Sequence, residues 1–203
     1  NLLKVGDLET FGRFLRLCAG RSGQLLNLSA LASDAGISHT TARRWLSVLE
    51  ASFLVALLRP HSRNFRKHLV RSPKLYFLDT GLLCWLLGIR EAGDLGHHAM
   101  RGAIFESLVQ AEIRKNFLHR GEQPGLFFWR DSAGHEVDFV VETPKGPVPV
   151  EAKSGLTLAS DAFGGLDYWR RLAGDPEGPA ALVYGGDEAF ERKGAVATPW
   201  ASL

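Results

Sequence analysis

Residues 135–153 read HEVDFVVETPKGPVPVEAK, a pattern that predicts two antiparallel strands joined by a tight turn. Apolar and charged side chains alternate in both halves, which is the period of a strand with one buried face. The segment Thr143-Pro-Lys-Gly146 suits a four-residue turn with proline at its second position. We therefore expect a β-hairpin in which the charged residues of both strands share a face.

The charged residues of this hairpin indicate a chemistry. With the two central turn residues as the loop, Asp138 stands opposite Glu151 and Glu136 stands opposite Lys153. Opposed carboxylates repel each other, and Mg²⁺ held between them would remove that cost because it prefers hard oxygen ligands. A lysine on the same face can orient a water molecule or stabilise a phosphate. The pattern predicts a site for Mg²⁺-dependent phosphodiester hydrolysis, and the alternative is a solvated strand face with alternating charges.

The surrounding residues predict a mixed α/β (α+β) domain over residues 96–203. An amphipathic helix and a strand precede the hairpin, and a helix and a strand follow it. These elements are expected at residues 102–118, 125–130, 161–172 and 180–184, before a short tail. Glu106, on the first of these helices, is the expected third carboxylate of the site. The polar stretch 93–99 marks the expected domain boundary.

Residues 1–95 predict a helix-turn-helix followed by a two-stranded hairpin, which is the winged-helix pattern. A helix is expected to start at Asp7-Leu-Glu9. Ser29 and Ser38 are expected to cap the next two helices, with a turn at Gly36 between them. Strands are expected at 53–58 and 75–78, and Asp79 is expected to cap a helix over 80–87.

This first domain also carries the residues expected to contact DNA. The helix from Thr40 to Ala51 would act as the recognition helix, and the run from Arg59 to Lys74 holds six basic residues and no acidic one. The expected DNA contacts are His39, Thr40, Arg43 and Arg44 on the helix and Arg63, Arg66, Lys67 and Arg71 in the wing. Winged helices also serve as protein-interaction modules, and that alternative stays open.

The composition sets limits on the class of protein. The 203 residues carry 24 Lys and Arg against 22 Asp and Glu, so only a local charge imbalance can favour nucleic acid. No apolar run approaches the length of a membrane span, and no signal peptide or P-loop is present. The two cysteines lack metal-ligand spacing and are expected to be reduced thiols in a cytoplasmic protein. The start without methionine suggests a piece of a longer protein.

Five stretches carry a family resemblance. They are LLNLS (25–29), SHTTARRWL (38–46), KLYFLDTGLL (74–83), RGAIFE (101–106) and FWRDSAGHEVD (128–138). In these stretches the chain resembles the C-terminal module, a domain of unknown function, of prokaryotic AAA-type ATP-binding proteins. Its second half resembles the PD-(D/E)xK nuclease superfamily, with a restriction-endonuclease-like αβββαβ core.

The resemblance implies roles for particular residues. Asp138 matches the first metal carboxylate, Glu151-Ala-Lys153 matches the (D/E)xK element, and Glu106 matches the acidic residue of the first core helix. Val137 departs from the proline in the motif's name. The implied function is a DNA-interacting module of an ATPase with a metal-dependent deoxyribonuclease site, and the implied partners are DNA and the ATPase domain. The alternative is a non-catalytic binding or regulatory appendage, and a homo-oligomer is compatible with either.

Overall fold

A computed structural model of the chain describes residues 8–62, 70–192 and 194–203 and shows an α+β protein. By its internal contacts the chain divides into two compact units. The first unit comprises Asn1–Leu57 and Ser72–Ser107, and the second comprises Leu58–Arg71 and Leu108–Leu203. Within the described ranges, no helix combines the length and the apolar character that a membrane span requires.

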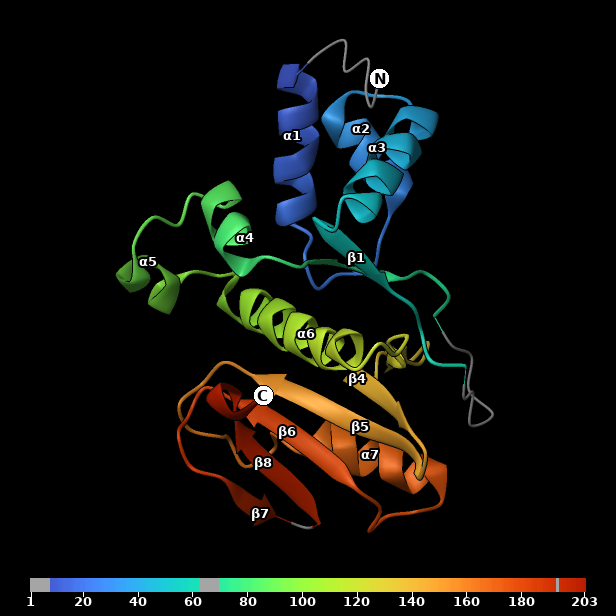
Figure 1. Cartoon of the computed structure of the whole chain (residues 1–203), viewed down its shortest axis with the longest axis vertical. Helices are drawn as coiled ribbons and strands as arrows, with labels where there is room; N and C mark the ends of the chain where they lie inside the picture. The colour runs from blue at the N-terminus through green and yellow to red at the C-terminus, as the bar shows by residue number, and fades with distance from the viewer. Residues whose placement is uncertain (1–7, 63–69, 193) are drawn as a thin grey trace. The chain divides into compact units, whose positions relative to one another are not determined.

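The first unit is mostly helical, with one small sheet (Figure 1). Its helices are α1 (Leu8–Ala19), α2 (Leu28–Ala35), α3 (His39–Ala51), α4 (Thr80–Leu86) and α5 (Ala92–His97), and its strands are β1 (Val55–Leu58) and β2 (Lys74–Phe77). Apolar faces of these elements share one core, which includes Phe14, Leu31, Trp45, Leu49, Leu75, Phe77 and Leu83. The position Asp7, where the first helix was expected to begin, lies outside the described residues.

Local signals explain the turn between α2 and α3. Gly36 adopts the left-handed conformation (φ 69°) in which glycine is favoured. The side chain of Ser38 accepts a hydrogen bond from the backbone N–H of Thr41 at 3.1 Å, so Ser38 caps α3 as expected. The cap of α2 is Asn27, whose Oδ1 accepts from the N–H of Ala30 at 3.0 Å. The prediction that Ser29 caps this helix was wrong, because Ser29 lies inside its first turn.

Two further expectations for the first unit need correction. The strand expected from Phe53 begins at Val55, because Phe53 has a positive φ of 56° and a largely exposed ring. The polar stretch expected to be a linker contains α5, which starts with a capping box between Glu91 and Asp94. Asp79 caps α4 as expected, since its Oδ1 accepts from the N–H of Leu82 at 2.7 Å.

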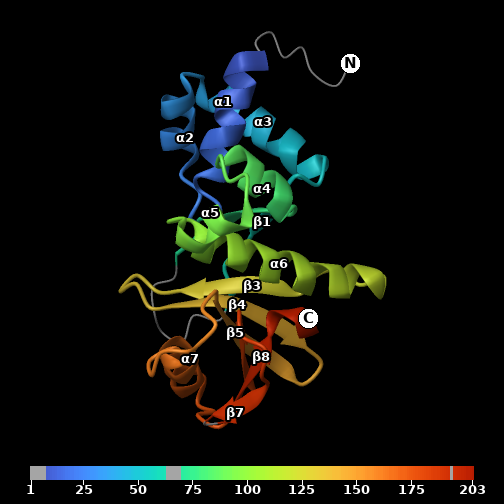
Figure 2. The same cartoon turned by 90° about the vertical axis from the view of Figure 1, so that its left-hand side faces the viewer.

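The second unit contains a six-stranded mixed sheet, in the order β3-β4-β5-β6-β8-β7. The strands are β3 (Leu126–Arg130), β4 (Glu136–Thr143), β5 (Gly146–Lys153), β6 (Ala180–Tyr184), β7 (Phe190–Arg192) and β8 (Ala195–Pro199). Helix α7 (Gly164–Ala173) packs on one face over a core with Trp129, Val140, Leu166, Trp169 and Leu182. The C-terminal half of α6 (Arg101–His119) lies over the other face (Figures 1 and 2).

The expected tail after β6 is in fact part of the sheet. Strand β8 pairs in parallel with β6, and β7 pairs antiparallel with β8. A short 3-10 helix, Trp200–Ser202, follows. Strand β7 is only three residues long and mostly exposed, so its sequence lacks the alternation of apolar and polar residues that identified the other strands.

The hairpin of β4 and β5 has the predicted register from Phe139–Val150 to Thr143–Gly146. On its other side β4 carries a bulge against β3. Trp129 pairs with Val137 and Phe127 pairs with Val140, so two residues of β4, Asp138 and Phe139, lie opposite the single residue between them. The regular β4–β5 ladder therefore stops just before Asp138.

Three described residues of the predicted wing, Arg59, His61 and Val70, form backbone hydrogen bonds with β3 in the second unit. The carbonyl of Arg59 accepts from the N–H of Phe128 at 3.1 Å, and the N–H of His61 donates to the carbonyl of Phe128 at 2.6 Å. Val70 donates to Arg130 at 3.2 Å. Arg63, Arg66 and Lys67 lie outside the described residues.

Candidate hydrolytic site

Asp138, Glu151 and Lys153 come together where the β4–β5 ladder ends. The Nζ of Lys153 lies 2.8 Å from Glu151 Oε2 and 3.9 Å from Asp138 Oδ2. The backbone N–H of Ala152, no longer needed by the ladder, donates to Asp138 Oδ2 at 3.0 Å. Three of the four residues predicted for catalysis thus form one cluster.

The electrostatics of this cluster are dominated by Glu151. Its side chain is only 6% exposed, against 42% for Lys153. Burial, and then the negative charge of Asp138, raise the pKa of Glu151 well above its ordinary value, although Lys153 opposes the shift. Two neighbouring carboxylates that are poorly solvated repel each other, and a proton or a cation bound between them would relieve this repulsion.

The backbone around the cluster explains its position. The bulge in β4 turns Asp138 out of the regular alternation and toward the end of β5. On the same side of the sheet, the first turn of α7 approaches so closely that a Cβ on Gly165 would overlap Glu151 Oε1 and lie 2.9 Å from the Glu136 carbonyl oxygen. A glycine at this position therefore allows the helix to cover Glu151.

Glu106, the fourth predicted residue, lies in the first unit and has partners there. Its Oε1 accepts from Lys74 Nζ at 2.9 Å and from the Tyr76 hydroxyl, and both of these residues are buried. Across residues 8–62, 70–192 and 194–203, no group of three or more His, Cys, Asp or Glu side chains is arranged to hold a metal ion. The candidate site consequently consists of two carboxylates and one lysine.

The residues predicted to contact DNA are exposed where the structure describes them. His39, Thr40, Arg43 and Arg44 line the N-terminal part of α3, while Trp45, Leu46 and Leu49 of the same helix are buried in the core. Neither arginine forms an ion pair with another described side chain. Arg71, from the expected wing, is also exposed. The side chains of these four residues of α3 are therefore exposed to solvent.

Sequence reasoning missed a second polar cluster next to the hydrolytic one. Asp131 is 1% exposed and accepts hydrogen bonds from the N–H groups of Ala133 and His135, both at 3.0 Å. The His135 ring contacts the same carboxylate and stacks on Tyr168 of α7. The signal was the turn sequence Asp131-Ser-Ala-Gly134, in which the N–H of Gly134 donates to the carbonyl of Asp131 at 3.2 Å, with His135 directly after the turn.

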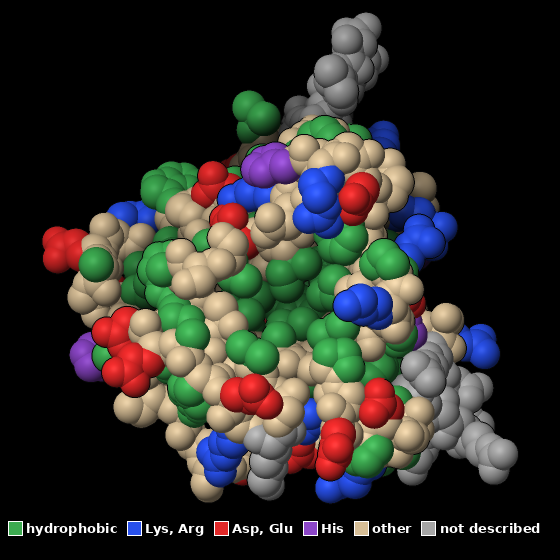
Figure 3. Space-filling view, turned by 60° about the horizontal axis from the view of Figure 1, so that its bottom comes forward, with side chains coloured by type: hydrophobic (Ala, Val, Ile, Leu, Met, Phe, Trp, Pro, Cys, Tyr) green, Lys and Arg blue, Asp and Glu red, His purple; other side chains and the backbone are tan. Residues whose placement is uncertain are grey.

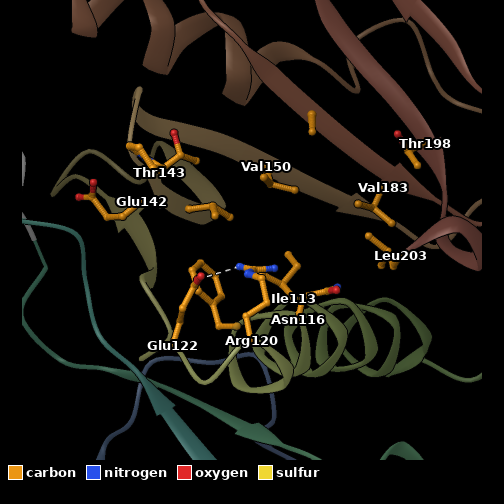
Figure 4. Close-up of a pocket in the computed structure, with 14 residues that line it drawn as sticks. Ile113, Asn116, Arg120, Glu122, Glu142, Thr143, Val150, Val183, Thr198 and Leu203 are labelled. Atoms are coloured by element: carbon orange, nitrogen blue, oxygen red, sulfur yellow. Dashed lines mark hydrogen bonds and ion pairs between the residues drawn. The ribbon is translucent and has the colours of Figure 1, made fainter.

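An apolar cavity of about 540 Å³ lies on the opposite face of the sheet, under α6. In Figure 4 Ile113, Asn116 and Arg120 point from the helix toward Val150 and Val183 on the strands, and Arg120 pairs with Glu122 at its rim. In the space-filling view, apolar side chains gather in a hollow that charged side chains surround (Figure 3). Neither the cavity nor its lining was predicted.

Comparison with known proteins gives two family matches and two relatives. Residues 1–93 match the domain of unknown function DUF8612, and residues 101–203 match the domain of unknown function DUF4143. The chain is 35% identical over 148 residues to the uncharacterized protein Mb2031c of Mycobacterium bovis and to the uncharacterized protein Rv2008c of Mycobacterium tuberculosis. The matched stretch is 73% of this chain and 33% of each relative, so the chain spans about a third of their length. From the match over its second half, the chain belongs to the DUF4143 family.

Proposed function

We propose that the second unit is a restriction-endonuclease-like domain that hydrolyses DNA phosphodiesters with a divalent metal ion. The observation that carries the proposal is the cluster of Asp138, Glu151 and Lys153 at the open end of the β4–β5 ladder. The order of α6, three antiparallel strands, α7 and a parallel strand supports the same assignment. These three residues are also the ones that match the superfamily's metal and lysine motif.

The donors present suit Mg²⁺. Asp138 and Glu151 offer hard carboxylate oxygens, and burial together with the charge of Asp138 raises the pKa of Glu151 although Lys153 lies beside it, so a cation between the two carboxylates would relieve their repulsion. Asp138, Glu151 and the Ala152 carbonyl would hold the ion. When bound, the ion supplies polarisation of a phosphate oxygen and acidification of a coordinated water. Lys153, with the most exposed of the three side chains, would orient the attacking water or stabilise the developing phosphate charge.

The first unit would supply affinity for DNA as a winged helix. The exposed His39, Thr40, Arg43 and Arg44 of this unit would contact the DNA, and Arg71, which belongs to the second unit, would be a separate phosphate contact. We also infer that the chain acts as the C-terminal module of a longer AAA-type ATP-binding protein. The likeness of its five quoted stretches to such modules supports this, as do the relatives, of which the matched stretch makes up only 33%.

A nuclease assay tests the catalytic proposal. Cleavage of labelled plasmid and of linear DNA would be followed with Mg²⁺ or Mn²⁺, comparing the wild type with Lys153→Ala and Asp138→Asn. Glu191→Gln, a change at an exposed carboxylate on β7, is the matched control. We expect metal-dependent cleavage in the wild type and in the control, and at least a roughly hundredfold loss in both site variants. Equal cleavage in all four proteins would show a contaminating nuclease.

A second candidate function is a non-catalytic DNA-binding appendage of the ATPase. Two observations favour it. Lys153 is ion-paired with Glu151, and Glu106 is engaged by Lys74 and Tyr76 in the first unit. This function predicts no cleavage of any DNA form together with binding that weakens as salt rises, because phosphate contacts release counterions. A protein-interaction module predicts neither cleavage nor a salt-dependent affinity for DNA.

A further inference from the structure

Two neighbours, Asp131 and Tyr168, hold the side chain of His135 in one orientation. Its Nδ1 lies 3.0 Å from Asp131 Oδ2, which restrains the imidazole in its own plane. Its ring stacks on the ring of Tyr168 with the centroids 4.1 Å apart and the planes 13° apart, which restrains the plane itself. The Tyr168 hydroxyl lies 3.4 Å from the same Asp131 oxygen and ties the arrangement together. The ring is therefore held in one orientation before anything binds to it.

The protonation of this pair can be assigned from its surroundings. Burial raises the pKa of the Asp131 carboxyl, but the hydrogen bonds from His135 and from the Ala133 N–H outweigh it, so the net pKa lies below its ordinary value. Asp131 is thus ionised and can only accept, and His135 donates from Nδ1. The donor edge of the imidazole is occupied by a buried carboxylate.

The part of His135 that remains exposed follows from these contacts. The side chain is 49% exposed, although Tyr168 covers one face of its ring and Asp131 covers the Nδ1 edge. The open surface must then be the other face of the ring and the Nε2 edge. The result is a flat aromatic surface of fixed orientation that faces solvent.

This surface lies beside the candidate hydrolytic site. Tyr168 and Gly165 are three residues apart on α7, so they share one face of the helix about 4.5 Å apart along its axis. Gly165 contacts Glu151, and Tyr168 carries the His135 ring. A group stacked on His135 and a phosphate at the carboxylates would belong to the same short stretch of a nucleic acid strand.

We propose that the exposed face of His135 is a stacking platform for an unpaired nucleobase next to the scissile phosphate. This inference rests on the proposed function and specifies its substrate class, which is a single strand or a duplex with an unpaired stretch. Bases in an intact duplex already stack on their neighbours, so only an unpaired base offers a free face to a protein ring. A platform that is held rigid in advance loses little side-chain entropy when a base stacks on it.

The test measures binding without cleavage. Fluorescence anisotropy in EDTA would follow a labelled single-stranded oligothymidylate and a labelled hairpin duplex, with the wild type, His135→Ala, His135→Phe and the control His119→Ala, an exposed histidine at the end of α6. For the single strand, His135→Ala should raise Kd by about 5- to 160-fold, the range for loss of one stacked base. His135→Phe keeps a flat ring on Tyr168 and should stay within about threefold of the wild type. The duplex Kd should not change in any variant.

The outcomes separate this inference from the proposed function. An unchanged single-strand Kd in His135→Ala, an equal loss in His135→Phe, or an equal loss on the duplex would each overturn the platform. Loss of metal-dependent cleavage in Asp138→Asn would still support the hydrolytic site in those cases. Conversely, a protein without nuclease activity that shows the predicted binding pattern retains the platform. Thermal melting of each variant would confirm that the turn holding Asp131 remains folded.

Discussion

Two adjacent glycines at the start of α7 should respond in opposite ways to the same substitution. Gly164 and Gly165 both lie in the first turn of the helix. A Cβ on Gly164 would meet no heavy atom within 4 Å, whereas a Cβ on Gly165 would overlap Glu151 Oε1 and lie 2.9 Å from the Glu136 carbonyl oxygen. The two variants therefore differ in one contact, with Glu151 and the backbone of β4.

The magnitudes follow from helix propensity and packing. Gly164→Ala should raise the free energy of unfolding by up to about 1 kcal/mol, because alanine loses less backbone entropy in a helix. Gly165→Ala receives the same benefit, but it forces Glu151 or the helix to move, and overpacking of this kind costs about 1–3 kcal/mol. We expect Gly165→Ala to be less stable than the wild type. The difference in stability between Gly165→Ala and Gly164→Ala should be larger still.

Urea denaturation followed by circular dichroism would measure the free energy of unfolding of both variants. In a Glu151→Ala background, the cost of Gly165→Ala should fall by at least about 0.5 kcal/mol, since one of its two clashes is gone. If Gly164→Ala and Gly165→Ala had the same stability, the close approach of α7 to Glu151 would be refuted, and with it the burial that raises the pKa of this residue.

Three further predictions concern other parts of the chain. Ser38→Ala should lower the free energy of unfolding by about 1 kcal/mol, because it removes the cap of α3, whereas Ser29→Ala should be neutral or slightly stabilising. Equal losses of stability in urea denaturation would contradict the assignment of the caps. Because the pKa of Glu151 is raised, its protonated carboxyl stabilises the fold fully below the ordinary pKa of 4.5, and this contribution is lost as the pH rises through the higher pKa of the folded state. The free energy of unfolding of the wild type should therefore fall over this pH range, and Glu151→Gln should flatten the fall. Parallel pH profiles of the two proteins would argue against the raised pKa. Burial raises the pKa of the Cys18 thiol to about 12, so iodoacetamide at neutral pH should label the partly exposed Cys84 before Cys18 in the native protein. Mass spectrometry that shows the reverse order would contradict the burial of Cys18 on α1.

Much of the candidate site could be predicted from the sequence, because it depends on local rules. The alternation in residues 135–153 and the turn at Pro144 were enough to fix the β4–β5 register, and the period of two placed Asp138 near Glu151. The helix-turn-helix was equally local, since Gly36 and Ser38 act on their immediate neighbours.

The features that were missed depend on contacts between distant residues. The bulge at Asp138 and Phe139 arises from pairing with β3, and the burial of Glu151 arises from Gly165 on α7, more than ten residues further along the chain. Glu106 looked like a metal ligand because of its helix and spacing, but its Lys74 and Tyr76 partners come from a strand about thirty residues earlier. No periodic pattern reports such contacts.

The position of the predicted wing also depends on contacts with distant residues. Its basic composition favoured a role at the DNA backbone, but Arg59 and His61 form backbone hydrogen bonds with Phe128 on β3. An exposed strand edge attracts any extended segment that can reach it, whatever the charge of that segment. Charge alone therefore could not indicate to which compact unit these residues belong.

Binding of Mn²⁺ to the metal-free protein tests the central claim most directly. Electron paramagnetic resonance of free Mn²⁺ during a titration would count the bound ions in the wild type, Asp138→Asn, Glu151→Gln and the control Glu191→Gln. We predict one saturable site in the wild type and in the control, and its loss in both site variants. Saturable binding that survives Asp138→Asn and Glu151→Gln, or no saturable binding in the wild type, would contradict a metal site between these two carboxylates.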